Sequence, residues 1–296
     1  MDIRLVKRDD IVKEKWNGSV HYATNGNVFG YMWYLDFVAK DWDALIEGDY
    51  LSVFPLVYKK RFLGGKALYQ PDLMRAMGIY SVKALSALRI KAFLDAIPAE
   101  YRSIDITLNA RNRPPRDGSF QTTELTNHLL PLNESYESLA QKYSPEFQEK
   151  IALAEEKGLL PIGSIKPEKL AAFFQENNHR TAVMEQQFHT LQRIMYNVLH
   201  RGTGFATAIA HPETEELLAA DFFIFSHGRM TSLAPVVSKK GKELGAQELL
   251  MDYMIRSNAS RPILLDFNTQ ESNDLAQAMG AQTETFYQIK QKRGLF

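Results

Sequence analysis

Residues 233–254, LAPVVSKKGKELGAQELLMDYM, combine small and basic side chains where an apolar segment gives way to an amphipathic one. Leu249, Leu250 and Tyr253 recur at helical spacing, so a strand-to-helix turn is predicted near Gly241. The free amides of a first helical turn favour anionic oxygens, and small residues let the backbone approach them closely. The segment is therefore either a cradle for a phosphate-bearing cofactor or a plain strand-to-helix connection. The candidate cofactor-binding residues are Val236, Val237, Lys240, Gly241, Lys242, Gly245 and Ala246.

Two aspartates stand inside apolar, strand-like segments and are candidates for proton transfer. Asp266 lies between Leu265 and Phe267, where burial would raise the pKa of its carboxyl towards a useful range. Asp221 precedes two phenylalanines and is a candidate to line the same site. The alternatives are a structural hydrogen-bonding role for Asp266 and a solvent-facing position for Asp221.

Composition narrows the class of protein. The chain has 296 residues, 45% of them hydrophobic, which suffices for one large domain or two smaller ones. The 35 basic and 35 acidic side chains balance, so no global field attracts nucleic acid or an anionic membrane. The absence of cysteine excludes disulfides, thiolate metal sites and a cysteine nucleophile. The charged N-terminus and the lack of an apolar run of about 20 residues predict a cytoplasmic chain without a membrane span. The seven histidines are scattered, so no metal site is predicted.

The two halves of the chain repeat one order of predicted elements: a hairpin, a strand, a helix and a second strand. These elements span 42–58, 66–70, 81–97 (with Ser81 as the helix N-cap) and 104–108 in the first half, and 203–226, 229–237, 241–256 and 262–268 in the second. The second strand of each half carries an aspartate, Asp105 or Asp266, with an asparagine shortly after it. The repeat predicts a duplicated mixed αβ unit with a right-handed, parallel strand–helix–strand crossover. Residues 134–157 are predicted to form a bridging helix.

This unit resembles the GNAT acyltransferase fold, in which the turn and the helix N-terminus bind the pyrophosphate of acyl-coenzyme A. The family pattern is Gln/Arg-x-x-Gly-x-Gly/Ala, and from Lys242 this chain reads Lys-Glu-Leu-Gly-Ala-Gln. Two tandem units resemble the FemAB-like transferases. The segments that carry this resemblance are YMWYLDFVAKDWDALIEGDYLSVFPLVYKKRF, LYQPDL, YSPEFQEKIALAEEKGL and LLDFNTQES followed by LAQAMGA. The resemblance implies an α+β fold of two GNAT-like units, residues 1–132 and 161–296, joined by a linker helix at 133–160.

The resemblance also implies roles for individual residues. The cofactor site falls in the C-terminal unit, and the first-half turn DLMRAMGIYS is expected to hold none. Asp266 becomes the base or the group that orients an acceptor amine, with Asp221 beside it. Tyr287, in the last strand, becomes the acid that protonates a leaving thiolate. The implied substrate-binding residues are Trp33, Tyr34, Tyr69, Gln70 and Asn268.

The predicted function is transfer of an acyl group from acyl-coenzyme A, such as acetyl-coenzyme A, to a small-molecule or peptide amine. One alternative is a FemAB-type aminoacyltransferase that uses aminoacyl-tRNA to extend cell-wall precursor peptides. The zero net charge disfavours tRNA, since its phosphates require basic side chains. Another alternative is a degenerate GNAT-like protein that binds without turnover. No DNA partner and no metal are expected, and the chain is predicted to be a monomer or a homodimer.

Overall fold

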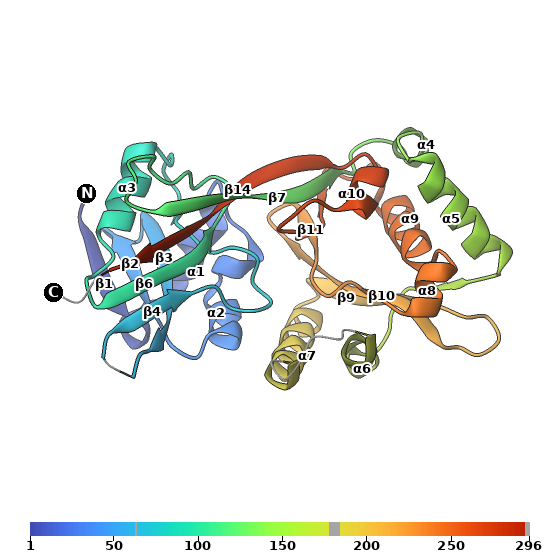
Figure 1. The fold of residues 1–296 in the computed structure, drawn as a ribbon, viewed down its shortest axis with the longest axis horizontal. Helices are drawn as coiled ribbons and strands as arrows, with labels where there is room; N and C mark the ends of the chain where they lie inside the picture. The colour runs from blue at the N-terminus through green and yellow to red at the C-terminus, as the bar shows by residue number, and fades with distance from the viewer. Residues whose placement is uncertain (63, 178–183, 294–296) are drawn as a thin grey trace. The chain divides into compact units, whose positions relative to one another are not determined.

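The computed structural model describes residues 1–296 except residue 63, residues 178–183 and residues 294–296. The chain divides into two compact units, Met1–Thr126 together with Glu284–Phe296, and Asn127–Thr283 (Figure 1). Sequence alone predicts the C-terminal strand in the second unit, whereas most of that strand packs in the first. Its hydrogen bonds to a strand of the first unit are the reason.

The first unit is built around a mixed sheet in the order β1-β2-β3-β4-β6-β14. Its elements are β1 (Ile3–Lys7), η1 (Arg8–Asp10), α1 (Lys13–Tyr22), η2 (Val28–Gly30), α2 (Met32–Val38), β2 (Trp42–Glu47), β3 (Ser52–Lys60), β4 (Lys66–Tyr69), β5 (Tyr80–Ser81), α3 (Ala87–Asp95) and β6 (Tyr101–Leu108). Two long strands, β7 (Gln121–Pro131) and β14 (Gln282–Lys292), belong partly to this unit and partly to the second. The predicted hairpin is β2 and β3, which pair antiparallel, and β4 and β6 form the predicted parallel pair.

The helix of this crossover starts later than predicted. Ser81 belongs to β5, where it pairs with Ser52 of β3 and shares a hydrogen bond with its hydroxyl at 2.9 Å. Ser86 is the N-cap instead, because its hydroxyl accepts from the Arg89 N–H at 3.2 Å. A second serine five residues downstream therefore starts the helix.

The second unit contains a sheet in the order β7-β13-β11-β10-β9-β8. Its elements are α4 (Tyr136–Ala140), α5 (Pro145–Glu156), β8 (Leu160–Ile162), α6 (Pro167–Asn177), α7 (Met184–His200), β9 (Gly204–Ala210), β10 (Leu217–Ser226), β11 (Arg229–Ser232), β12 (Val236–Val237), α8 (Lys239–Glu243), α9 (Ala246–Asn258), β13 (Leu264–Asp266) and α10 (Asp274–Ala278). β9 and β10 form the predicted hairpin, and β11 and β13 form the predicted parallel pair.

Helices cover both faces of this sheet (Figure 1). Helices α5 and α9 pack on one face, where Phe147, Ile151 and Leu250 join the apolar residues of the strands in one core. Helices α6 and α7 lie on the other face. The predicted bridging helix is therefore part of the core of the second unit. It is two helices rather than one, because Ser144 and Pro145 start α5 as N-cap and first residue after α4 has ended.

Candidate functional site

In each unit, two parallel strands separate at the aspartate that the sequence repeat marks. In the first unit, β4 pairs with β6 as far as Tyr69 and Asp105. In the second, β11 pairs with β13 as far as Thr231 and Asp266. Beyond these pairs the strand that precedes each helix turns away from its neighbour. We call the place where the two parallel strands separate the parting of that unit. The two partings are equivalent places in the two units, where the backbone of one strand lacks its parallel partner.

The chain itself closes the parting in the first unit. The Gln70 side chain acts as a strand would, because its Oε1 accepts from the Thr107 N–H at 3.0 Å. Its Nε2 donates to the Met74 carbonyl at 2.6 Å. The Met77 N–H then donates to the Thr107 carbonyl at 2.8 Å, and the Asn109 N–H donates to the Met77 carbonyl at 2.6 Å. The backbone groups of this parting are thus satisfied internally.

The parting in the second unit contains a β-bulge. Ser232 lies opposite Phe223 of β10, and Val236 lies opposite Ala220. Val236 is four residues after Ser232, whereas their partners on β10 are only three residues apart, so one extra residue bulges out between 233 and 235. This bulge divides the predicted single strand 229–237 into β11 and β12. Within the described part of the chain, no backbone hydrogen bond joins residues 233–237 to residues 267–270.

The bulge leaves one backbone edge of β12 directed away from β10. The N–H of Ser238 donates to the Leu218 carbonyl of β10 at 2.9 Å. Alternate residues of an antiparallel strand direct their backbone groups to the same neighbour, so Val236 also faces β10 and Val237 does not. One edge of β12 is therefore paired with β10, and the backbone groups of Val237 lie on the opposite edge. The N–H and C=O of Val237 are therefore available on the side of the parting.

Asp221 holds the bulge in place. Its side chain is 1% exposed and accepts from the Ser232 hydroxyl at 2.5 Å and from the Ala234 N–H at 3.0 Å. The Phe222 N–H also donates to it, at 2.7 Å. Burial raises the pKa of Asp221 from 3.8 to about 7, against the lowering effect of these three hydrogen bonds. The folded chain therefore keeps the proton of this carboxyl to a higher pH than an exposed aspartate would.

Asp266 is equally buried, at 1% exposed, and its oxygens are engaged by the protein. Oδ2 accepts from the Arg229 guanidinium at 3.0 Å, and Oδ1 accepts from the Asn127 amide at 2.9 Å. The Asn268 N–H donates to Oδ1 at 2.9 Å, and Asn268 turns the chain with a φ of 56°. These contacts favour the structural alternative for Asp266.

The two aspartates point to opposite faces of the sheet, which corrects the prediction that they line one site. Thr231 lies opposite both Ile224 and Asp266, so these three side chains share a face. Asp221 is three residues from Ile224 and points the other way, because successive strand residues alternate between faces. Its hydrogen bond to Ser232, the neighbour of Thr231, agrees with this placement.

Contacts within the chain explain the two glycines of the predicted cradle. A β-carbon at Gly241 would lie 2.1 Å from the Leu218 carbonyl oxygen, and one at Gly245 would lie 2.2 Å from that of Lys150 in α5. Gly245 has a φ of 72°, so the predicted helix over 241–256 is broken into α8 and α9. Ala246 is fully buried. Close packing on β10 at Gly241 and on α5 at Gly245 accounts for these two glycines, and a cofactor role for the segment stays a prediction.

The lysines of the same turn remain on the surface. Lys240 pairs with Glu216 at 3.2 Å, and both side chains are about half exposed. Lys239 and Lys242 are exposed and form no ion pair among the described residues. Their positive charge is therefore available to an anionic ligand, although as flexible surface groups.

The predicted substrate-binding residues of the first unit pack against their neighbours or form hydrogen bonds to a loop. Tyr34 is fully buried, which raises the pKa of its phenol, and its hydroxyl donates to the Leu73 carbonyl. Trp33 packs edge to face on Tyr34, and a lysine ammonium lies 4.3 Å above the Tyr69 ring. Tyr34 and Gln70 both hold the loop that closes the first parting. A substrate-binding role for these residues stays a prediction.

Tyr287 lies in the first unit, on β14 opposite Leu108 of β6. It lines a cavity of about 360 Å³ together with Arg113 and Arg116. The predicted cofactor residues and the open parting belong to the second unit. The role of Tyr287 as the acid for a leaving thiolate stays a prediction.

Sequence reasoning missed the polar partners of both buried aspartates. Arg229 and Thr231 alternate along β11, which is a signal that a strand directs polar groups to one face. Asn127 lies 139 residues from Asp266 and gives no local signal. Ser232 stands in an ordinary polar position, and only the bulge brings it to Asp221.

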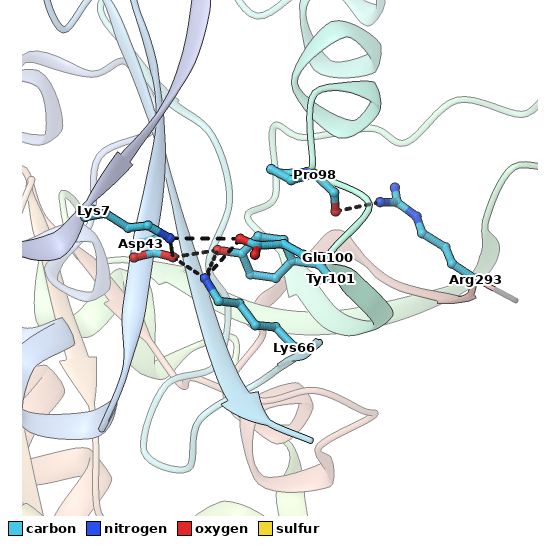
Figure 2. A network of polar contacts seen from close by, with 7 residues as sticks. All are labelled: Lys7, Asp43, Lys66, Pro98, Glu100, Tyr101 and Arg293. Carbon is cyan, nitrogen blue, oxygen red and sulfur yellow. Dashed lines mark hydrogen bonds and ion pairs between the residues drawn. The ribbon is translucent and has the colours of Figure 1, made fainter. Parts of the chain in front are cut away.

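A third buried carboxylate, also missed, belongs to a charged cluster in the first unit (Figure 2). Asp43 is 3% exposed and accepts from the Lys66 and Lys7 ammonium groups at 2.7 and 3.0 Å, and from the Tyr101 hydroxyl at 2.8 Å. Burial opposes its ionisation, but these hydrogen bonds prevail and hold the pKa of Asp43 below its ordinary value. Glu100 lies 3.1 Å from the same Lys66 ammonium. The ammonium groups of Lys7 and Lys66 neutralise the carboxylates of Asp43 and Glu100, so the cluster is interpreted as a structural ion-pair network.

The described residues contain neither a metal-binding cluster nor a membrane-spanning helix. Among them, no group of three or more histidine, aspartate or glutamate side chains is placed to hold a metal ion, and His179 lies outside them. No helix in the same part of the chain is both long and apolar enough to cross a membrane.

Comparison with known proteins identifies the fold. No family model matches the sequence, and no curated protein matches it. Among solved structures, FemX superposes with a TM-score of 0.66 at 12% identity, over 97% of each chain. A tandem GNAT protein from the clavulanic acid biosynthesis pathway, in a structure without AcCoA, gives 0.58 at 14% identity over 100% of each chain. L-PGS from Bacillus licheniformis gives 0.58 at 11% identity, over 94% of this chain and 91% of that one. The chain therefore has the tandem GNAT fold that FemX shares, as its sequence resemblance predicts.

Proposed function

We propose that the chain is an N-acyltransferase whose acyl donor binds in the second unit, where β11 and β13 part. One observation carries the proposal, namely the asymmetry between the two partings. Gln70 and Met77 close the first, whereas the second leaves the edge of β12 directed away from β10. Val237 is partly buried, and a backbone group shielded from water without a partner costs up to about 1–3 kcal/mol, so an edge of this kind favours a ligand that supplies hydrogen bonds.

Acyl-coenzyme A is the proposed donor. The amides of its pantetheine arm can pair with the N–H and C=O of Val237 as an added strand would. The exposed Lys239 and Lys242 supply positive charge for its phosphates. The fold shared with the tandem GNAT protein and with FemX supports acyl transfer.

Acyl transfer to an amine places three demands on the site. The neutral amine attacks the thioester carbonyl, an oxyanion forms, and the thiolate leaves as the amide bond is completed. A base must take the proton from the amine, an N–H donor must stabilise the oxyanion, and an acid must protonate the leaving thiolate. In this proposal Asp221 acts as a positioning residue, because it fixes the bulge that directs the Val237 backbone. The acceptor is a small-molecule or peptide amine.

The test is binding of acetyl-coenzyme A to the full chain, measured by calorimetry. Val237→Pro deletes an N–H that faces away from β10, so the strand pairing survives. Its affinity is expected to fall about tenfold, the effect of one hydrogen bond of about 1.4 kcal/mol. Val236→Pro is the matched control, since it deletes an N–H directed to β10 and is expected to lower the unfolding temperature instead. Unchanged affinity in a folded Val237→Pro protein would remove the edge of β12 from the donor site.

Aminoacyl-tRNA is the second candidate donor, and one observation favours it. Packing against Leu218 and Lys150 explains the glycines that acyl-coenzyme A would use in the cradle. Filter binding of aminoacyl-tRNA, against deacylated tRNA as the control, tests this donor. If neither donor binds the folded chain, the non-catalytic GNAT-like alternative replaces both proposals.

A further inference from the structure

The first unit contains a cavity of about 360 Å³ between the loop that follows β6 and the strands β7 and β14. Its polar lining consists of Arg113, Arg116, Thr122, Glu124 and Tyr287. Its apolar wall comes from Pro114, Pro115 and Phe120. This volume is near the low end of small-molecule sites, which span about 300–1,000 Å³. It therefore suits a compact ligand rather than a whole nucleotide cofactor.

The two arginines of the lining, Arg113 and Arg116, are exposed side chains. Some arginines of the chain are held by a carboxylate, as Arg8 is by Asp36 at 2.6 Å and Arg256 by Asp252 at 3.2 Å. Neither Arg113 nor Arg116 forms an ion pair among the described residues. The acid next to Arg116, Asp117, is already engaged by Lys91 at 3.4 Å and by Ser119.

The charge of the lining is positive, since the lining has two guanidinium groups and a single carboxylate, that of Glu124. Guanidinium groups bind oxyanions through two parallel N–H donors. The Tyr287 hydroxyl can add a third donor, and the proline and phenylalanine wall offers a surface to an aromatic or aliphatic body. Oxyanion and apolar body together define the chemistry of the ligand.

We propose that this cavity is a binding site for a compact organic oxyanion, a phosphate or carboxylate attached to an apolar body, held by Arg113, Arg116 and Tyr287. Tyr287 thereby has a role in the first unit that does not depend on the leaving thiolate of an acyl transfer. The site is separate from the β12 edge of the second unit, so either proposal can fail without the other.

The experiment measures binding of phenyl phosphate, benzoate and benzyl alcohol to the full chain by calorimetry. One or both anions are expected to bind, and the difference between them identifies phosphate or carboxylate as the preferred group. Benzyl alcohol, which has the ring without the charge, is expected not to bind. Binding of benzyl alcohol as tight as that of the anions, or no binding by either anion, would overturn the proposal.

Variants then separate the site from general surface charge. Arg113→Gln/Arg116→Gln is expected to weaken anion binding about tenfold or more, and Tyr287→Phe by a smaller factor. Glu124→Gln is expected to tighten binding, because it removes the carboxylate that repels the anion. Arg111→Gln is the matched control, since Arg111 is an exposed arginine of the same loop outside the lining. Equal weakening by Arg111→Gln and by the double variant would refute the site.

Discussion

Asp221→Asn is expected to remove a pH-dependent part of the stability of the protein. Burial raises the pKa of this carboxyl from 3.8 to about 7 in the folded chain. Between these two values the folded state keeps a proton that the unfolded state releases, so the free energy of unfolding falls as pH rises. The full difference amounts to about 4 kcal/mol, and about 2–3 kcal/mol of it is lost between about pH 5 and pH 8.

Urea unfolding of the full chain, followed by circular dichroism across this pH range, is the assay. The quantity of interest is the difference between the natural chain and Asp221→Asn, because other groups titrate equally in both. His128 is one such group, since burial lowers its pKa. Asparagine keeps one oxygen for the bulge and adds a constant offset, whereas the slope reports the carboxyl.

The natural chain is expected to lose stability relative to the variant as pH rises. Asp105→Asn serves as the control, because Asp105 is half exposed and pairs with Lys290 at 3.4 Å. Parallel stability curves for the natural chain and Asp221→Asn would refute the reasoning, since the carboxyl would then not keep its proton on folding.

Two further predictions concern packing and buried charge. Gly245→Ala is expected to destabilise the chain by more than about 1 kcal/mol, because its φ is positive and its β-carbon would meet the backbone of α5. Gly18→Ala, in open space on α1, is expected to stabilise it by about 0.5–1 kcal/mol, and thermal unfolding that ranks the two the other way would contradict the packing. Lys66→Met is expected to cost about 3 kcal/mol in urea unfolding, because Asp43 stays buried with one ammonium partner fewer. Adding Asp43→Asn is expected to recover part of this cost, and a larger loss in the double variant would contradict the pairing.

Local pattern was enough to predict the elements that carry the fold. The helical spacing of Leu249, Leu250 and Tyr253 predicted α9, and alternation predicted the strand around Asp105. Turn residues between two apolar segments predicted the hairpins. The repeated order of these elements led to the tandem arrangement, which the match to solved tandem GNAT structures confirms at the level of the fold. These properties depend on residues near one another in the chain, so the sequence contains them.

The candidate site was only partly accessible to the same reasoning. The sequence singled out Asp221 and Asp266, and the structure finds both buried, Asp266 in β13 at the parting and Asp221 in β10, which pairs with β11. It could not assign them to opposite faces, because the bulge and the register that decide this arise from pairing with β10. It also could not separate a cofactor cradle from a packing contact at Gly245, since the neighbouring carbonyl belongs to Lys150 of another helix.

Local sequence pattern predicted the order of the main strands and helices, whereas several of their ends and breaks, such as the one at Gly245 between α8 and α9, emerged only in the structure. Tertiary structure decided their partners: β14 joins β6 of the first unit, Gln70 closes one parting, and Asn127 reaches Asp266 across 139 residues. Periodicity along a segment shows which side is apolar. It does not show which distant segment covers that side, because many segments offer similar apolar or polar surfaces. The choice among them follows from the packing and hydrogen bonding of the whole chain.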